Sequence, residues 1–242
     1  MTQNIYDNPD FFANYAQLGR SVHGLDGAAE WPALQAMLPN MHGVRVVDLG
    51  CGYGWFCRWA AEQGARSVLG LDVSQKMLER ARATTGDARI QYAQADLEQL
   101  VLPECSVDLV YSSLTLHYLK DLPGLLAAAH KALVPGGHLV FSIEHPIFMA
   151  ARQPDWLTTA DGRKTWPVDS YQREGERVTN WLADGVVKQH RTLGTLLNAV
   201  IDAGFTLAHI EDWGPTAQQL AAVPALADEV ERPMLLLVGA HR

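Results

Sequence analysis

Cysteine is scarce in this chain, and its pattern excludes two common kinds of scaffold. The 242 residues include three cysteines, Cys51, Cys57 and Cys105, and no C-x-x-C pair. An odd number in this arrangement predicts neither a disulfide framework nor a zinc site. We therefore expect no metal ion, and we expect Cys57 and Cys105 to be small buried or half-buried side chains.

Basic residues are scarce as well. The chain has 19 Lys and Arg against 27 Asp and Glu, which gives a formal net charge of −8 and a pI of about 5.5. Binding to a nucleic-acid backbone relies on clustered Lys and Arg, and the sequence shows no such cluster. The composition thus argues against a nucleic-acid partner.

A long apolar run is missing from the amino end. Met1 is followed by polar residues and by Pro9, so we expect neither a signal peptide nor a membrane span in this part of the chain. We expect no membrane association and a cytoplasmic location. The length suits one α/β domain with an insertion.

The most informative stretch that is present is Val46-Val47-Asp48-Leu49-Gly50-Cys51-Gly52-Tyr53-Gly54. Its β-branched start predicts a buried parallel strand, and Trp55 to Ala61 has helical apolar spacing. Glycine permits a sharp bend between the two and lets a ligand approach the backbone closely. The free N–H groups of the new helix then face a crevice, which suits a nucleotide-like ligand.

One family of such turns fits poorly. In the dinucleotide pattern G-x-G-x-x-G the third glycine would fall at position 55, which is Trp55. Trp55 therefore counts against a nicotinamide-dependent oxidoreductase, which stays an alternative that tight NADH binding would favour. A non-catalytic cofactor-binding module is the other alternative that the sequence leaves open.

Acidic residues recur at the ends of successive predicted strands. Ser67 to Asp72 is an apolar strand ending in an acid, and a helix from Gln75 to Thr84 follows it with Ser74 as N-cap. A third strand, Ile90 to Ala93, precedes Asp96. Together with Asp48, these acids mark the carboxyl edge of the sheet, where open α/β sheets bind ligands.

The spacing Asp-x-Gly-x-Gly-x-Gly resembles the first motif of class I S-adenosylmethionine-dependent methyltransferases. Val107 to Ser113 then reads as a fourth strand, and Leu133 to Ser142 as a helix end, a Pro-Gly-Gly turn and a fifth strand, in the order of that superfamily. The likeness covers about Val44 to Glu144 and resumes more weakly in Thr192 to Ala240. The order of motifs is similar to the small-molecule branch that includes the ubiquinone and menaquinone biosynthesis methyltransferases.

The resemblance implies an α/β fold, a Rossmann-like seven-stranded, mostly parallel sheet with the last strand antiparallel, helices on both faces, and an inserted cap after strand five. It implies a single domain, 1–242, divided into an N-terminal helical lid (1–40), a cofactor-binding core (44–144), the cap (145–191) and the C-terminal part of the sheet (192–242). Within the cap, Arg177 to Leu182 and Val186 to His190 read as a hairpin around Ala183-Asp184-Gly185. The cap suits a substrate cover or a dimer contact, so we expect a monomer or a homodimer.

The resemblance also gives the cofactor residues their roles. Asp48 is expected near the methionine ammonium, Asp72 on the ribose hydroxyls and Asp96 on the adenine amino group. Other contacts are expected from the turn, namely Gly50, Cys51, Gly52 and Gly54, and from the walls of the adenine site, namely Val73, Met77 and Leu97. Ser112 of the fourth strand and the lid residues Tyr15 and Arg20 complete the set. Tyr15 and Arg20 would contact the cofactor carboxylate, although an aromatic stripe at helical spacing is more often ordinary packing.

Methyl transfer from a sulfonium needs alignment more than activation. S-adenosylmethionine is already reactive and is released as S-adenosylhomocysteine, so we expect no metal and at most one proton acceptor. His117, His145 and His190 are the candidates, with packing as the competing interpretation of each. The fourth-strand loop Ser112 to Thr115 lacks the Asp/Asn-Pro-Pro-aromatic pattern of nucleobase methyltransferases. We therefore expect methyl transfer to O, N or C of a small molecule.

Overall fold

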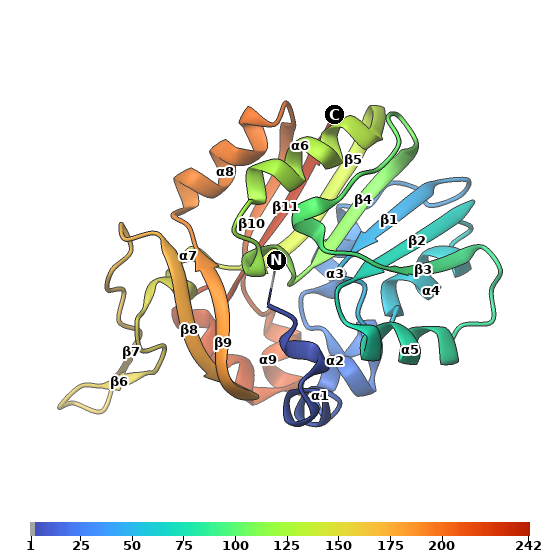
Figure 1. The fold of residues 1–242 in the computed structure, drawn as a ribbon. Coiled ribbons are helices and arrows are strands. Elements are labelled where there is room, and N and C mark those ends of the chain that lie inside the picture. Colours follow the sequence, from blue (N-terminus) through green and yellow to red (C-terminus); the bar gives the residue numbers. More distant parts are fainter. Residues whose placement is uncertain (1–2) are drawn as a thin grey trace.

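A seven-stranded sheet forms the centre of the computed structural model, which describes residues 3–242. The strand order is β10-β11-β5-β4-β1-β2-β3. β11 is antiparallel to both of its neighbours, β5 and β10, while the pairs from β5 to β3 are parallel. The predicted fold class is thus confirmed, including the antiparallel last strand (Figure 1).

The strands of this sheet are β1 (Arg45–Leu49), β2 (Ser67–Asp72), β3 (Ile90–Gln94), β4 (Val107–Ser113), β5 (Leu133–Glu144), β10 (Thr206–Trp213) and β11 (Leu235–His241). Two hairpins stand apart from it, β6 (Leu157–Thr158) with β7 (Lys164–Thr165), and β8 (Gly175–Trp181) with β9 (Ala183–His190). The α-helices are α1 (Pro9–Tyr15), α2 (Gly19–Val22), α3 (Trp31–Ala36), α4 (Trp55–Glu62), α5 (Gln75–Ala83), α6 (Leu122–Ala132), α7 (Pro146–Ala150), α8 (Leu193–Asp202), α9 (Ala217–Ala222) and α10 (Asp228–Glu231). Short 3-10 turns complete the chain at η1 (Ile5–Asp7), η2 (Gly24–Gly27), η3 (Leu97–Gln99), η4 (Leu116–Tyr118) and η5 (Pro224–Ala227).

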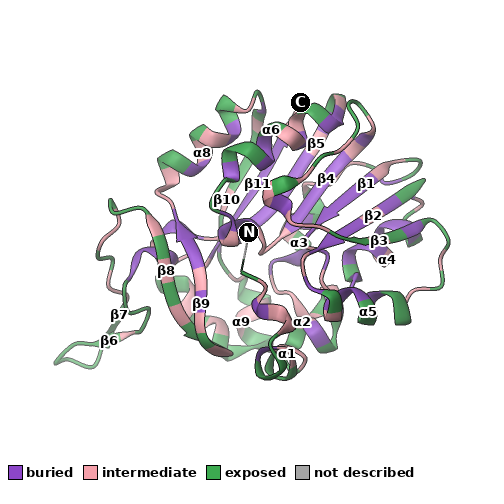
Figure 2. Ribbon diagram, in the orientation of Figure 1, coloured by how far each residue is buried: buried purple, intermediate pink, exposed green. Residues whose placement is uncertain are grey.

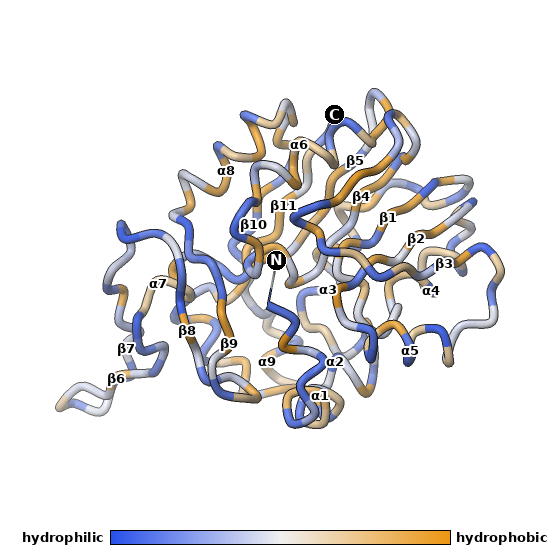
Figure 3. The backbone as a smooth tube through the Cα atoms, in the orientation of Figure 1, coloured by the Kyte–Doolittle hydropathy of each residue, from blue (hydrophilic) through white to orange (hydrophobic). Residues whose placement is uncertain are grey.

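Strand periodicity divides the core into two layers. Along β11, Leu236 and Val238 pack with α6 and α8, whereas Leu235 and Leu237 pack with α3 and α4. Successive side chains of a strand point to opposite faces, so a sheet covered on both sides is apolar throughout. Figures 2 and 3 show the central strands as buried and hydrophobic, and β6 and β7 as exposed.

Apolar runs and a capping residue in the sequence predicted the bounds of several strands and helices to within one residue. β2 and β4 have the predicted bounds, and α5 ends at Ala83, one residue before the predicted Thr84. The predicted cap of α5 is present, because the Ser74 hydroxyl accepts a hydrogen bond from the Met77 N–H at 3.1 Å. A capping side chain satisfies an N–H that the helix itself cannot.

The predicted turn of the cap hairpin is wrong, although the hairpin itself is present. Trp181 pairs with Ala183, so the reversal is at Leu182, which has a φ of 62°. Asp184 and Gly185 belong to β9. They lie opposite the point in β8, between Thr179 and Trp181, where the register of the pairing shifts. Gly185 has a φ of 75° and accommodates this irregularity as a bulge-like residue.

The amino-terminal segment contacts the cap hairpin directly. The Gln3 amide donates to Gly185 O at 2.9 Å and accepts from the Val187 N–H at 3.0 Å. The Asn14 amide donates to Leu182 O at 2.9 Å. Figure 1 shows α1 and α2, in dark blue, and the orange hairpin of β8 and β9 beside the same end of the sheet.

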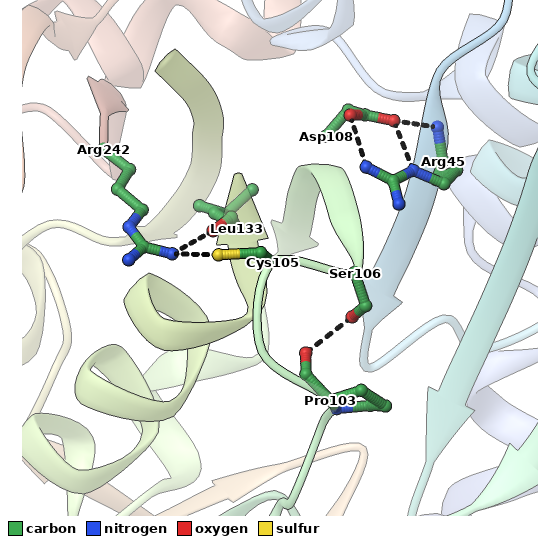
Figure 4. Close-up of polar contacts among 7 residues, drawn as sticks. All are labelled: Arg45, Pro103, Cys105, Ser106, Asp108, Leu133 and Arg242. Carbon is green, nitrogen blue, oxygen red and sulfur yellow. Dashed lines mark hydrogen bonds and ion pairs between the residues drawn. The ribbon is translucent and has the colours of Figure 1, made fainter. Parts of the chain in front are cut away.

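The opposite end of the sheet is held by polar contacts at strand starts and at the carboxyl terminus (Figure 4). The Arg45 guanidinium donates two hydrogen bonds to the Asp108 carboxylate, both at 2.9 Å. Ser106 donates to Pro103 O at 2.7 Å, and Arg242 donates to Leu133 O and to the Cys105 sulfur. Cys57 is buried as predicted, but Cys105 is exposed, because it lies in the loop before β4.

Candidate functional site

A cavity of about 450 Å³ opens at the carboxyl edge of the sheet, between the glycine turn, the amino-terminal helices and the cap. Most of the predicted cofactor residues line it: Tyr15, Arg20, Asp48, Gly50, Cys51, Gly52, Asp72, Val73, Met77 and Leu97. The lid and the cap both contribute walls, for example through Tyr6 and Trp181. Cavities of this size commonly hold small ligands.

The three glycines of the turn are required for two different steric reasons. All three glycines have positive φ, of 77° at Gly50, 51° at Gly52 and 72° at Gly54. A Cβ on Gly50 would lie 2.0 Å from the Thr115 hydroxyl oxygen, and one on Gly54 would lie 2.1 Å from the Tyr92 hydroxyl oxygen. A Cβ on Gly52 would meet nothing within 4 Å. Gly50 and Gly54 serve close packing, whereas Gly52 keeps its side of the cavity open.

Asp48 is a buried carboxylate at the end of β1. It is 2% exposed, and the Cys57 thiol donates to it at 3.2 Å. Burial raises the pKa of Asp48 to about 7, more than the Cys57 hydrogen bond lowers it. Among residues 3–242 no Lys or Arg forms an ion pair with Asp48, so this wall favours a cationic ligand group.

Asp72 is fixed by backbone N–H groups at the end of β2. It accepts from Gly52 at 2.8 Å through one oxygen and from Ser74 at 2.9 Å through the other. Burial raises the pKa of Asp72 to about 6 against these two hydrogen bonds. Each carboxylate oxygen has a second lone pair, so the group can accept hydrogen bonds from a diol.

Three predicted cofactor residues are not part of the cavity wall. Gly54 packs against Tyr92, and Asp96 caps η3 by accepting from the Glu98 N–H at 3.2 Å. Ser112 is fully buried and donates to Leu49 O at 2.8 Å. Ser113 lines the cavity instead, because neighbouring residues of β4 point to opposite faces of the sheet.

Only one of the three histidine candidates lines the cavity in the described part of the chain. His117 does so, at 2% exposure. His145 caps α7 by accepting from the Ile147 N–H at 3.0 Å, and its other ring nitrogen lies 2.9 Å from Asp212. His190 is buried with a ring nitrogen 2.8 Å from Tyr171 O. In this structure His145 and His190 have capping and packing contacts and do not line the cavity, and a catalytic role for any of the three histidines stays a prediction.

Two charged residues that sequence reasoning missed lie beside His117. The Lys188 ammonium donates to the Glu144 carboxylate at 2.5 Å, and both side chains line the cavity. Glu144 is the last residue of β5, as Asp72 is of β2, so an acid at the carboxyl end of a strand could have identified it as a candidate site residue. Lys188 comes from the cap strand β9 and had no comparable signal.

Residues 3–242 contain no group of three His, Cys, Asp or Glu side chains placed to hold a metal ion. Within the same residues, every helix is too short or too polar to cross a membrane.

Known proteins resemble the chain along its whole length. A crystal structure of an S-adenosylmethionine-dependent methyltransferase from Mesorhizobium loti is 61% identical, covers 90% of this chain and 100% of that one, and superposes with a TM-score of 0.88. The chain belongs to the S-adenosylmethionine-dependent methyltransferases. A family model described as a methyltransferase domain matches residues 47–141 of this methyltransferase.

Two curated relatives of the methyltransferase differ in how much they share. An uncharacterised protein of Haemophilus influenzae is 32% identical over 99% of this chain and 97% of its own length. A malonyl-[acyl-carrier protein] O-methyltransferase of Serratia marcescens is 39% identical, but over 41% of this chain and 38% of its own length. The family membership decides against the nicotinamide-dependent oxidoreductase and in favour of S-adenosylmethionine as the cofactor.

The cavity of the methyltransferase fits that cofactor. S-adenosylmethionine carries an ammonium, a sulfonium and a ribose diol, and the wall offers two buried carboxylates without Lys or Arg partners among the described residues. Gly52 leaves room for close approach to the backbone. Met77 and Leu97 supply apolar surface for a flat base.

Proposed function

We propose that this methyltransferase transfers a methyl group to O, N or C of a small-molecule acceptor held in the cavity. The observation that carries the proposal is the continuity of that cavity. It joins Asp48 and Asp72 on one side to His117, Glu144 and the cap on the other. Donor and acceptor can thus meet under one cover, away from bulk water.

We assign the cofactor contacts to the residues that line the donor side. Asp48 would hold the ammonium, Asp72 the ribose hydroxyls, and Val73 and Met77 the adenine. Arg20, in reach of the cavity beside Tyr15, would hold the carboxylate. When bound, S-adenosylmethionine supplies an electrophilic methyl group, and the protein aligns the acceptor with it.

Calorimetry with S-adenosylhomocysteine tests the proposal. Asp72→Ala removes an acceptor that faces a ribose, and we expect binding to weaken roughly 10-fold to 100-fold. Asp87→Ala is the matched control, because Asp87 lies at the surface and pairs with Arg89 at 2.6 Å. A folded wild-type protein that fails to bind at millimolar ligand would refute the proposed function.

Several expectations from the sequence stay predictions. These are the cytoplasmic location, the absence of a nucleic-acid partner, the monomeric or homodimeric state, and the division of a single domain into lid, core, cap and C-terminal part. Gel filtration and a nucleic-acid binding assay address them directly.

A further inference from the structure

Aromatic rings line the cavity on and next to the side that holds His117 and Glu144, which we call the acceptor side. The Tyr6 and Tyr118 hydroxyl oxygens lie 3.2 Å apart, and Trp181 packs edge-on against Phe11 with ring centroids 5.6 Å apart. Phe148 from α7 adds a further ring to the wall. Walls of this kind suit a flat, largely apolar acceptor.

Both cations of the cavity wall are already paired. Within the described residues, the only Lys and Arg side chains that line it are Arg20 and Lys188. Arg20 donates to both oxygens of Glu30, at 3.0 and 3.2 Å, and Glu30 is 2% exposed. Lys188 is 4% exposed and donates to Glu144. We assign Arg20 to the cofactor carboxylate, through the N–H groups that Glu30 leaves free, so Lys188 is the cation left for an acceptor in the described part of the wall. An anionic acceptor that reached Lys188 would lie beside the buried Glu144 carboxylate, which is costly.

His117 presents a donor to the cavity rather than a proton acceptor. Burial lowers the pKa of His117 to about 4, so the imidazole is neutral at physiological pH. Its Nδ1 accepts from the backbone N–H of Glu144 at 3.4 Å. A neutral imidazole has one donor and one acceptor, so we assign the proton to Nε2.

The ionised group that remains on this side is Glu144. Burial acts to raise its pKa, but the charged groups nearby, among them the Lys188 ammonium that donates to Glu144, outweigh burial and hold the pKa of Glu144 below its ordinary value. Arg232 adds to this effect, while Tyr118 packs beside the carboxylate as an uncharged phenol. Glu144 is therefore a carboxylate with free lone pairs at the acceptor side.

We propose that the acceptor is a neutral aromatic compound that carries its nucleophile as O–H or N–H, and that Glu144 receives the proton. The proposal rests on the proposed function. As the acceptor oxygen or nitrogen forms its bond to the methyl carbon, the carbon–sulfur bond of the donor breaks and its electron pair stays on sulfur. The acceptor proton passes to the Glu144 carboxylate. That proton becomes strongly acidic as the new bond forms, so a carboxylate is a sufficient base.

A carboxylate acceptor would fit this site poorly. It needs no proton acceptor, and it would place a second negative charge beside Glu144 without a free cation to balance it. A malonyl group is such an acceptor. The partial relative from Serratia marcescens, named for malonyl-[acyl-carrier protein], is thus a poor guide to the substrate of this chain.

A matched panel tests the acceptor class. Each phenol or aniline is paired with the benzoic acid that carries a carboxylate in place of the hydroxyl or amino group. The compounds are offered at millimolar concentration with S-adenosylmethionine, and the formation of S-adenosylhomocysteine is measured. We expect turnover among the neutral compounds and at least 100-fold less with the acids. Comparable turnover of the acids, or turnover of no neutral compound by protein that binds S-adenosylhomocysteine, overturns the proposal. Loss of that binding would instead count against the proposed function.

Glu144→Gln separates a proton acceptor from a structural residue. We expect kcat for phenol to fall about 100-fold. With 4-nitrophenol at a pH where it is already ionised, kcat should stay level or rise, because no proton needs removal and Lys188 is left unpaired. Glu104→Gln, at an exposed pair with Lys131, is the control and should behave as wild type. Equal losses with both acceptors would show that Glu144 acts through structure alone and would overturn its assignment.

Discussion

Asp48 and Asp72 are carboxyl groups that folding buries without a cation. Their pKa values are raised from an ordinary 3.8 to about 7 and about 6, and burial is the main cause of both shifts. A raised pKa in the folded state stabilises the free protein at low pH, and this contribution is lost as pH rises through 6 and 7. A cationic ligand reverses the balance, because it favours the ionised form.

Cofactor affinity should therefore depend on pH. We expect S-adenosylmethionine to bind more tightly as pH rises from 5.5 to 7.5, by up to about tenfold per pH unit for each proton released. Calorimetry in buffers of different ionisation enthalpy measures both the affinity and the protons. Asp48→Asn should flatten the upper part of the curve. A pH-independent affinity in the wild type would contradict the pKa shifts.

At the scale of elements, the turn between β1 and α4 combines two demands on glycine. Gly50 must pass close to Thr115, and Gly52 must leave space at the cavity. The first demand concerns folding and the second concerns ligand binding. A sequence pattern alone shows three equivalent glycines.

Alanine substitutions should separate these demands. Gly50→Ala places a Cβ 2.0 Å from the Thr115 hydroxyl oxygen at a φ of 77°, so we expect a loss of a few kcal/mol of folding free energy. Gly52→Ala has no such contact, so we expect about 1 kcal/mol from backbone strain and a much larger loss of cofactor affinity. Urea unfolding and calorimetry on the two variants measure the two effects. Equal destabilisation of the fold by both would contradict this division.

At the scale of the whole molecule, the amino-terminal segment bridges the cofactor side and the cap. Asp7 accepts from the Ser74 hydroxyl at 2.6 Å, two residues from Asp72. Gln3 contacts β9 through two hydrogen bonds. A ligand that contacts both Asp72 and the cap hairpin would thus help to hold the amino-terminal segment and the hairpin together over the cavity.

Hydrogen exchange should detect this coupling. We expect exchange in residues 3–22 and 175–190 to slow when S-adenosylhomocysteine binds, because opening the cover would then break ligand contacts as well. The starts of β1 and β4, at Arg45 and Asp108, lie at the opposite end of the strands from the cavity, serve as the internal control and should change little. Protection confined to the glycine turn would show that the cover acts independently of the cofactor.

Local patterns were sufficient for the main elements, and most of the residues that they singled out line one cavity, while the contacts of those residues with the cofactor stay predictions. Apolar runs located β2 and β4, Ser74 located the start of α5, and the glycine spacing with Asp48 and Asp72 identified the cofactor. These features depend on residues near one another in the chain, where period and capping act. The sequence pattern could not show that Ser113 lines the cavity while Ser112 is buried, because strand alternation must be anchored by packing.

The acceptor side depended on contacts between distant segments. Sequence by itself determined the strand, the glycine turn and the recurring acids, because each signal is local, and their resemblance to the methyltransferases predicted S-adenosylmethionine as the cofactor. Only the tertiary structure decided that His117 lines the cavity, that His145 and His190 do not, and that Lys188 pairs with Glu144 across 44 positions. Burial and pairing of that kind arise when the cap packs on the sheet, and no local pattern encodes them.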